Sequence, residues 1–146
     1  MKRQGCILHK MMLGMFVLLA VGMGNAQLEG PIVNVKIPFN FSIGAQSFAA
    51  GEYSLKPSLQ HTMLLRDQRG QALANILWAR SVESSEVPSS TKLVFSRYGG
   101  QYFLAQILVA GNGIGQELVK SPAELEMAKT KDLPGQQIAL SFVTHP

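Results

Sequence analysis

Few side chains beyond residue 26 could carry chemistry. That part of the chain has two histidines, His61 and His145, and no cysteine, because the single Cys6 precedes it. Zinc usually takes three or four convergent histidine, cysteine or acidic ligands, so this supply predicts no metal site. His61 and Asp67 could form a histidine–carboxylate pair across a hairpin, although a solvated histidine and a turn-forming aspartate explain the same two residues.

The other routes to catalysis also lack a defining pattern. Serine catalysis needs a nucleophile, a base and a group that orients the base. No G-x-S-x-G elbow occurs, and the serine cluster at 84–90 (SSEVPSS) has the composition of a loop. Two carboxylates could act as acid and base. Their spacing selects no pair among Glu52, Glu83, Glu86, Glu117, Glu124 and Glu126. We therefore assign no catalytic, cofactor-binding or metal-binding residue, and favour a protein that is not an enzyme and has no cofactor.

Two further patterns have structural explanations. Gly111, Gly113 and Gly115 form G-x-G-x-G, which lacks dinucleotide spacing and opens no helix, so it predicts a flexible connection. Ten aromatic side chains could line a ligand cavity, but most lie in expected strands, which favours core packing. They are Phe39, Phe41, Phe48, Tyr53, Trp78, Phe95, Tyr98, Tyr102, Phe103 and Phe142.

Residues 1–26 have the organisation of a signal peptide. Lys2, Arg3 and Lys10 make a positive beginning, and an uncharged apolar run covers 11–23. This run is shorter than the roughly 20 residues of a spanning helix and suits a signal-peptide core. Small residues follow, so we expect cleavage between Ala26 and Gln27, with an uncleaved anchor as the alternative. Membrane contact is then limited to this segment before cleavage, and the product is periplasmic or extracellular.

Removal of that segment changes the charge of the protein. The chain has 13 Lys and Arg residues against 9 Asp and Glu. Three of the basic residues precede residue 27, which leaves ten against nine, a net charge of +1. No basic run remains to follow a phosphate backbone, so nucleic-acid binding is not expected. About 120 residues suffice for one core, and we assign 27–146 to a single domain.

The clearest element is a strand that begins at Val33. In 33–43 every odd residue is apolar and every even residue is not, the period of a half-buried strand. Pro38 removes a backbone donor, so this strand should lie at an edge or be broken by a bulge. The odd residues are Val33, Val35, Ile37, Phe39, Phe41 and Ile43.

Six further strands and one helix are expected downstream. Strands are predicted at 52–56, 62–66, 71–82, 92–98 and 101–109. The segment at 71–82 is apolar on both faces as in a central strand, although its alanine and leucine residues also suit a helix. Gly99 and Gly100 should form a tight hairpin turn, both with positive φ. Ser121, Pro122 and Glu124 form a capping signature for a short helix to about residue 131. A last strand is predicted at 138–142.

These elements predict a mainly β fold, a small antiparallel barrel or sandwich of six to seven strands with one short helix in the C-terminal half. Three segments resemble a family of small secreted acidobacterial-type proteins of unknown function. The segments are IPFNFSIGAQSFAAGEYSL (37–55), TKLVFSRYGGQYFLAQI (91–107) and GQELVKSPAELEMAK (115–129). The resemblance implies export and a β-rich domain, and it implies no activity and no site residues.

The sequence thus predicts an exported, non-catalytic β domain that acts by binding or as an envelope component. One alternative is a small β-barrel carrier of an apolar ligand, with an apolar cavity and a polar group or two at its mouth. A second alternative is a hydrolase that uses His61, Asp67 and an unplaced serine. The sequence identifies no partner.

Overall fold

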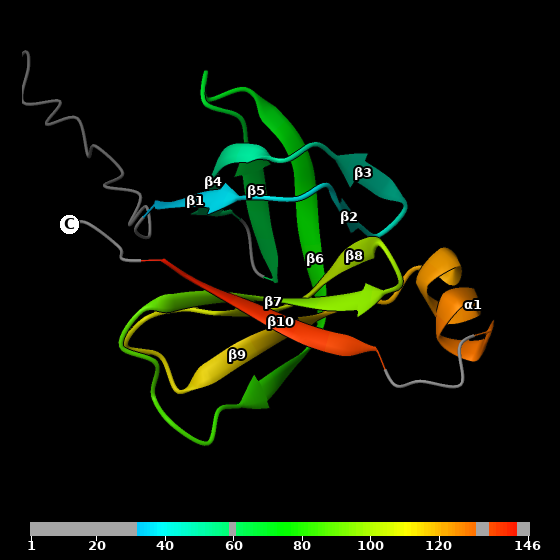
Figure 1. The fold of residues 1–146 in the computed structure, drawn as a ribbon. Coiled ribbons are helices and arrows are strands. Elements are labelled where there is room, and N and C mark those ends of the chain that lie inside the picture. The colour runs from blue at the N-terminus through cyan, green and yellow to red at the C-terminus, as the bar shows by residue number, and fades with distance from the viewer. Residues whose placement is uncertain (1–31, 59–60, 131–134, 143–146) are drawn as a thin grey trace, which may run out of the picture.

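The computed structural model describes residues 32–58, 61–130 and 135–142, which form ten strands and one helix (Figure 1). The strands are β1 (Val33–Ile37), β2 (Phe41–Ile43), β3 (Gln46–Phe48), β4 (Gly51–Pro57), β5 (Thr62–Arg66), β6 (Ala72–Glu83), β7 (Thr91–Tyr98), β8 (Gln101–Leu108), β9 (Ile114–Leu118) and β10 (Gln136–Phe142). The helix is α1 (Pro122–Thr130). The fold is therefore mainly β, as expected. Residues 1–26, predicted to be a signal peptide, lie outside the described residues, as do His145 and Lys131.

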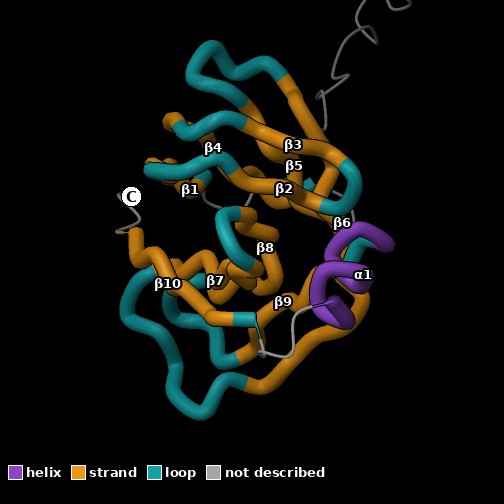
Figure 2. The backbone as a smooth tube through the Cα atoms, turned by 45° about the vertical axis from the view of Figure 1, so that its right-hand side comes forward, coloured by secondary structure: helices purple, strands orange, loops and turns teal. Residues whose placement is uncertain are grey.

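The sheet is dominated by antiparallel pairs and is not closed. Its order is β1-β4-β5-β6-β9-β8-β2-β3, with β7 on β8 and β10 on β7. Among the described strands only β2 and β8 pair in parallel. Strand β6 is long enough to pair with β5 through its first half and with β9 through its second half. In Figures 1 and 2 it thereby connects an upper layer, with β1, β4 and β5, to a lower layer with β7 to β10.

The alternating segment at 33–43 forms two strands rather than one. Val33, Val35 and Ile37 are buried in β1, and the intervening side chains are exposed. Pro38 follows the last residue of β1, and β1 pairs only with β4 among the described strands, so the expected edge position is confirmed. After the break the Asn40 side-chain oxygen accepts a hydrogen bond from the Ala50 N–H at 2.9 Å. This hydrogen bond joins the residue before β2 to the segment that follows β3.

The β7–β8 hairpin is confirmed, with a correction at its turn. Tyr98 pairs with Gln101, so Gly99 and Gly100 are the two loop residues. Gly99 has φ +64°, but Gly100 is not in the positive region. The prediction of positive φ at both residues was therefore wrong. A positive φ at the first loop residue alone is what a type II′ turn requires, and this turn also matches strand twist.

The strand count exceeds the six to seven predicted. Strand β3 lies in what the sequence presented as a connector, and β9 begins inside the glycine-containing segment expected to be a loop. The expected burial of both faces of β6 was also wrong, since Ile76 is its only fully buried residue and Leu77 is 62% exposed. The described residues include no second layer over the outer face of β6.

The helix begins as its capping signature predicts. The Ser121 hydroxyl accepts a hydrogen bond from the Glu124 N–H at 3.1 Å, which satisfies a donor of the first turn. The Glu124 side chain is buried, and burial raises the pKa of its carboxyl, with nearby Lys120 acting in the opposite direction. Among the described residues no helix has the length and apolar character needed to cross a membrane.

The space between the two layers holds the core. Its fully buried side chains come from both layers and are Ile37, Leu55, Leu65, Ile76, Leu93, Phe95 and Ile107. Aromatic rings join them: Phe41 lies 5.7 Å from Phe95 and 5.5 Å from Tyr53, and Phe39 stacks on Tyr102 at 3.9 Å between ring centroids. Core packing, the favoured explanation of these aromatics, accounts for their positions.

Candidate functional site

A groove of about 1130 Å³ lies on the outer face of β1, β4 and β5 and extends to the end of β10. The outward positions of β1 and β4 line it because strand side chains alternate and the other set is committed to the core. Ser141 and Phe142 of β10 form its far wall. The edge strands β1 and β10 come near each other here without pairing, so the groove lies where the sheet is open (Figure 1).

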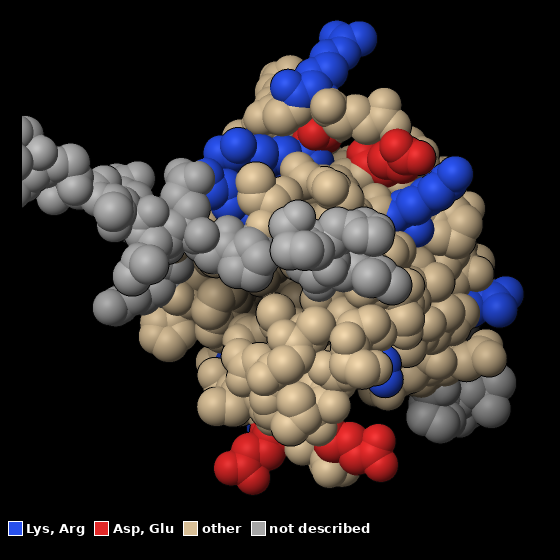
Figure 3. All heavy atoms as spheres, turned by 90° about the vertical axis from the view of Figure 1, so that its left-hand side faces the viewer, with Lys and Arg blue, Asp and Glu red and all other residues tan. Residues whose placement is uncertain are grey.

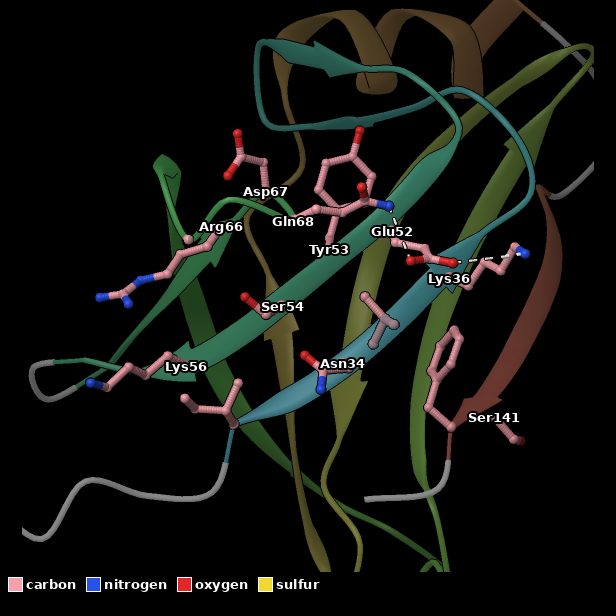
Figure 4. A pocket seen from close by; sticks show the side chains of 14 residues that line it. Asn34, Lys36, Glu52, Tyr53, Ser54, Lys56, Arg66, Asp67, Gln68 and Ser141 are labelled. Atoms are coloured by element: carbon pink, nitrogen blue, oxygen red, sulfur yellow. Dashed lines mark hydrogen bonds and ion pairs between the residues drawn. The ribbon is translucent and has the colours of Figure 1, made fainter. Parts of the chain in front are cut away.

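One end of the groove is internally neutralised. Lys36 of β1 and Glu52 of β4 face each other in the strand register, and their charged atoms lie 3.8 Å apart. The other Glu52 carboxylate oxygen accepts a hydrogen bond from the Gln68 side-chain amide at 3.0 Å. Figure 4 shows this three-residue network as dashed lines. Both oxygens of Glu52 therefore have partners within the protein.

The other end of the groove carries two basic side chains, Lys56 and Arg66. Asn34, Ser54 and Arg66 form one row across three strands, because Ser54 is in register with Asn34 on one side and with Arg66 on the other. Lys56 lies two residues beyond Ser54, which makes Lys56 and Arg66 diagonal cross-strand neighbours, about 7–8 Å apart at Cα. In Figure 4 both basic side chains extend toward the same end of the groove.

Arg66 has a buried donor without a partner. Its Nε is inaccessible to solvent and has no hydrogen-bond partner in the described part of the chain. A buried polar group left unpaired costs roughly 1–3 kcal/mol. The neighbouring carboxylate of Asp67 is already engaged, because one of its oxygens accepts hydrogen bonds from the Arg69 and Gln71 N–H groups in the β5–β6 turn. Among the described side chains that line the groove, the Arg66 Nε is therefore the buried donor left without a partner.

Two further features define the surroundings. The Tyr53 hydroxyl donates to the Ala49 carbonyl, and burial raises the pKa of this tyrosine. Tyr53 thus stays neutral and forms a fixed part of the groove wall. Figure 3 shows basic and acidic side chains side by side on the upper part of this side of the molecule, and further acidic side chains at its lower end.

The structure does not bring His61 and Asp67 together. His61 precedes β5 and Asp67 follows it, so six residues of extended chain, about 20 Å, separate their backbones. His61 is exposed, has φ +63° and lies 5.9 Å from Trp78 between ring centroids. With Asp67 held by its own turn, the hydrolase arrangement has no geometric basis in these two residues.

The other sequence candidates also have structural partners. Three of the six glutamates face basic side chains: Glu52 with Lys36, Glu117 with Arg80, and Glu126 with Lys129. Ser84 in the serine cluster donates to the Glu86 carbonyl and so belongs to a turn. In the glycine-containing segment Gly111 has φ +75°, and Gly115 lies in β9 against Leu108. The described residues contain no group of three or more His, Cys, Asp or Glu placed to hold a metal ion.

Sequence reasoning did not identify Arg66, Lys56, Asn34 or Ser54. Each was visible as the polar member of an alternating strand, but their common site depends on the register of three strands. Comparison with protein-family models, curated proteins and solved structures finds no match to this chain. The resemblance to a family of small secreted proteins therefore stays a prediction, and the site is interpreted from its own geometry.

Proposed function

We propose that this chain is an exported, non-catalytic binding domain whose groove holds an anionic chain-like ligand. The observation that carries the proposal is that Arg66 and Lys56 line the same end of the groove, where the Arg66 Nε has no partner among the described residues. A guanidinium presents several donors in a planar fork that matches a carboxylate or phosphate. Because the Nε itself is shielded from solvent, an anionic ligand in the groove would bond to the outer nitrogens of this fork.

The remaining lining favours a polar ligand of some length. Ser54 and Asn34 place neutral hydrogen-bonding groups next to Arg66, and the neutralised Lys36–Glu52–Gln68 network continues along the groove. Phe142 adds an apolar surface at the far wall. An acidic oligosaccharide combines these features, since its rings alternate polar edges and apolar faces and its carboxylates repeat along the chain.

An apolar ligand carried inside a barrel is less well supported. Such a carrier needs an apolar cavity within the fold. Here the space between the layers is occupied by side chains such as Phe95, Ile76 and Leu65, each about 1% exposed or less. The sheet is also open between β1 and β10. The groove, which is outside the core and mostly polar in its named side chains, therefore supports the binding-domain proposal better.

The direct test is calorimetric titration with a hexameric oligogalacturonate, with neutral maltohexaose as the ligand control. We expect binding of the acidic oligomer alone, weakened by added NaCl. Arg66→Gln should weaken it about 10- to 100-fold, since a hydrogen bond to a charged group contributes about 1.5–3 kcal/mol. Arg69→Gln is the matched control, because this exposed arginine follows in the next turn and does not line the groove. Equal weakening by both variants, or equal binding of both sugars, would contradict the proposal.

Export is a separate part of the proposal and has its own test. It is supported by the composition of residues 1–26. N-terminal sequencing of protein recovered outside the cytoplasm of an expressing bacterium should begin at Gln27, within a residue or two. A membrane-embedded product that retains residues 11–23 would instead support the anchor, and cytoplasmic retention would contradict export.

A further inference from the structure

Among the described strands, β10 is an edge without the usual protection against pairing. Three strands have a single strand partner among the described residues, namely β1, β3 and β10. Proteins usually protect such edges with short strands, charged side chains, proline or bulges. Strand β1 carries the exposed Lys36 and is followed by Pro38, and β3 has only three residues. Strand β10 has seven residues, QQIALSF, with no charge, proline or glycine.

The side chains of β10 also permit close approach of another strand. Gln136, Gln137, Ala139 and Ser141 are exposed, and the last two are small. The register with β7 is continuous over all seven residues, so the backbone is regular along its length. In Figures 1 and 2 β10 lies at the periphery of the lower layer, with its C-terminal end toward β1.

We propose that the free edge of β10 pairs with β10 of a second copy of this chain. A two-fold axis through Ala139, the central residue of the strand, makes the pairing antiparallel. Gln137 then faces Ser141 of the second copy, two side chains that can form a hydrogen bond. Ile138 faces Leu140, an apolar pair that continues the half-buried row of β10. The two lower layers become one continuous sheet.

Charge favours a second copy over a different protein. Isologous pairing places a strand opposite itself, so any charged edge risks like-charge repulsion, and β10 carries none. This pairing also alters the rim of the groove, whichever ligand the groove binds. Ser141 and Phe142 line it, and in this register they face Gln137 and Gln136 of the second copy. The second copy therefore contributes polar side chains to the groove rim.

The test is the mass of the full-length chain in solution, measured by light scattering after gel filtration. In a Cys6→Ser background we expect a dimer that dissociates on dilution. Ala139→Lys should give a monomer, because two lysines would meet at the axis. Ala79→Lys is the matched control, since it adds the same charge at an exposed position of β6 and should leave the dimer intact.

A second variant keeps the test decisive if Ala139→Lys fails to fold. Ala139→Cys should form a disulfide-linked dimer on mild oxidation, since the Cα atoms of directly opposed residues lie about 4.5–5.5 Å apart, within the range that a disulfide spans. Ala79→Cys should remain monomeric on a non-reducing gel. A wild-type chain that is monomeric at all concentrations, or a dimer unaffected by Ala139→Lys and not cross-linked by Ala139→Cys, would overturn the proposal. Neither result depends on the binding of oligogalacturonate.

Discussion

The contact of the two layers can be tested most sharply at Phe41. This residue belongs to the short strand β2, is 2% exposed, and its ring meets those of Phe48, Tyr53 and Phe95 at centroid distances of 5.4, 5.5 and 5.7 Å. Phe41→Ala removes the ring from a site enclosed by aromatic rings. The fully buried position places the cost within the usual range for such truncations, about 3–5 kcal/mol.

That cost should be visible in both chemical and thermal unfolding. For a domain of this size about 1 kcal/mol corresponds to roughly 4 °C, so we expect the Tm to fall by about 12–20 °C. Asn40→Ala is the neighbouring control. It removes an exposed side chain and one hydrogen bond to the Ala50 N–H, so it should cost about 1 kcal/mol. Urea melts followed by circular dichroism measure both. Similar losses at Phe41 and Asn40 would refute the assignment of β2 to the core.

Three further predictions concern stability. Gly135→Ala should destabilise clearly in urea melts, because a Cβ there would lie 2.6 Å from a ring carbon of the buried Tyr98; a parent-like melt would contradict this close approach. Gly99→Ala should cost about 1–2 kcal/mol for its positive φ, whereas Gly100→Ala, with open space and no positive φ, should melt like the parent; the reverse order would place the strain elsewhere. Burial raises the pKa of Glu124, so the folded state holds its proton more tightly than the unfolded state does. The Glu124 contribution to the free energy of unfolding should therefore decline as pH rises from the unfolded pKa near 4.5 through the raised folded value. Glu124→Gln should remove this decline. If the variant and the parent showed the same dependence of stability on pH, the prediction would be refuted.

Local pattern was enough to predict the elements whose sequence has a strong period. The alternation in β1 placed Val33 and Val35 inside and Lys36 outside, and Pro38 predicted an edge. Ser121 predicted the beginning of α1 because the cap is a local hydrogen bond. Strand β9 was missed because Gly115, Gln116 and Glu117 give no alternation of apolar and polar residues. Its place in the sheet comes from partners on β6 and β8.

The groove could not be predicted, for a related reason. Asn34, Ser54 and Arg66 lie far apart in sequence and form one row only through the registers of β1, β4 and β5. The net charge of residues 27–146, close to neutral, gave no indication that Lys56 and Arg66 lie together at one end of a groove. The predicted pairing of His61 with Asp67 was wrong for the opposite reason. Two residues close in sequence were separated by the length of β5.

The central claim is that an anionic group bonds to Arg66 in the groove, and the arginine Nε–H signals in a nitrogen–proton NMR spectrum test it most directly. The Arg66 signal is assigned by its loss in Arg66→Gln, and oligogalacturonate is then added in steps. We predict that the Arg66 Nε–H signal shifts progressively and saturates, because the outer nitrogens of the same guanidinium gain a charged acceptor. The signals of Arg69 and Arg97, which do not line the groove, should stay in place. An unmoved Arg66 signal at saturating oligogalacturonate, or equal shifts at all three arginines, would contradict the account.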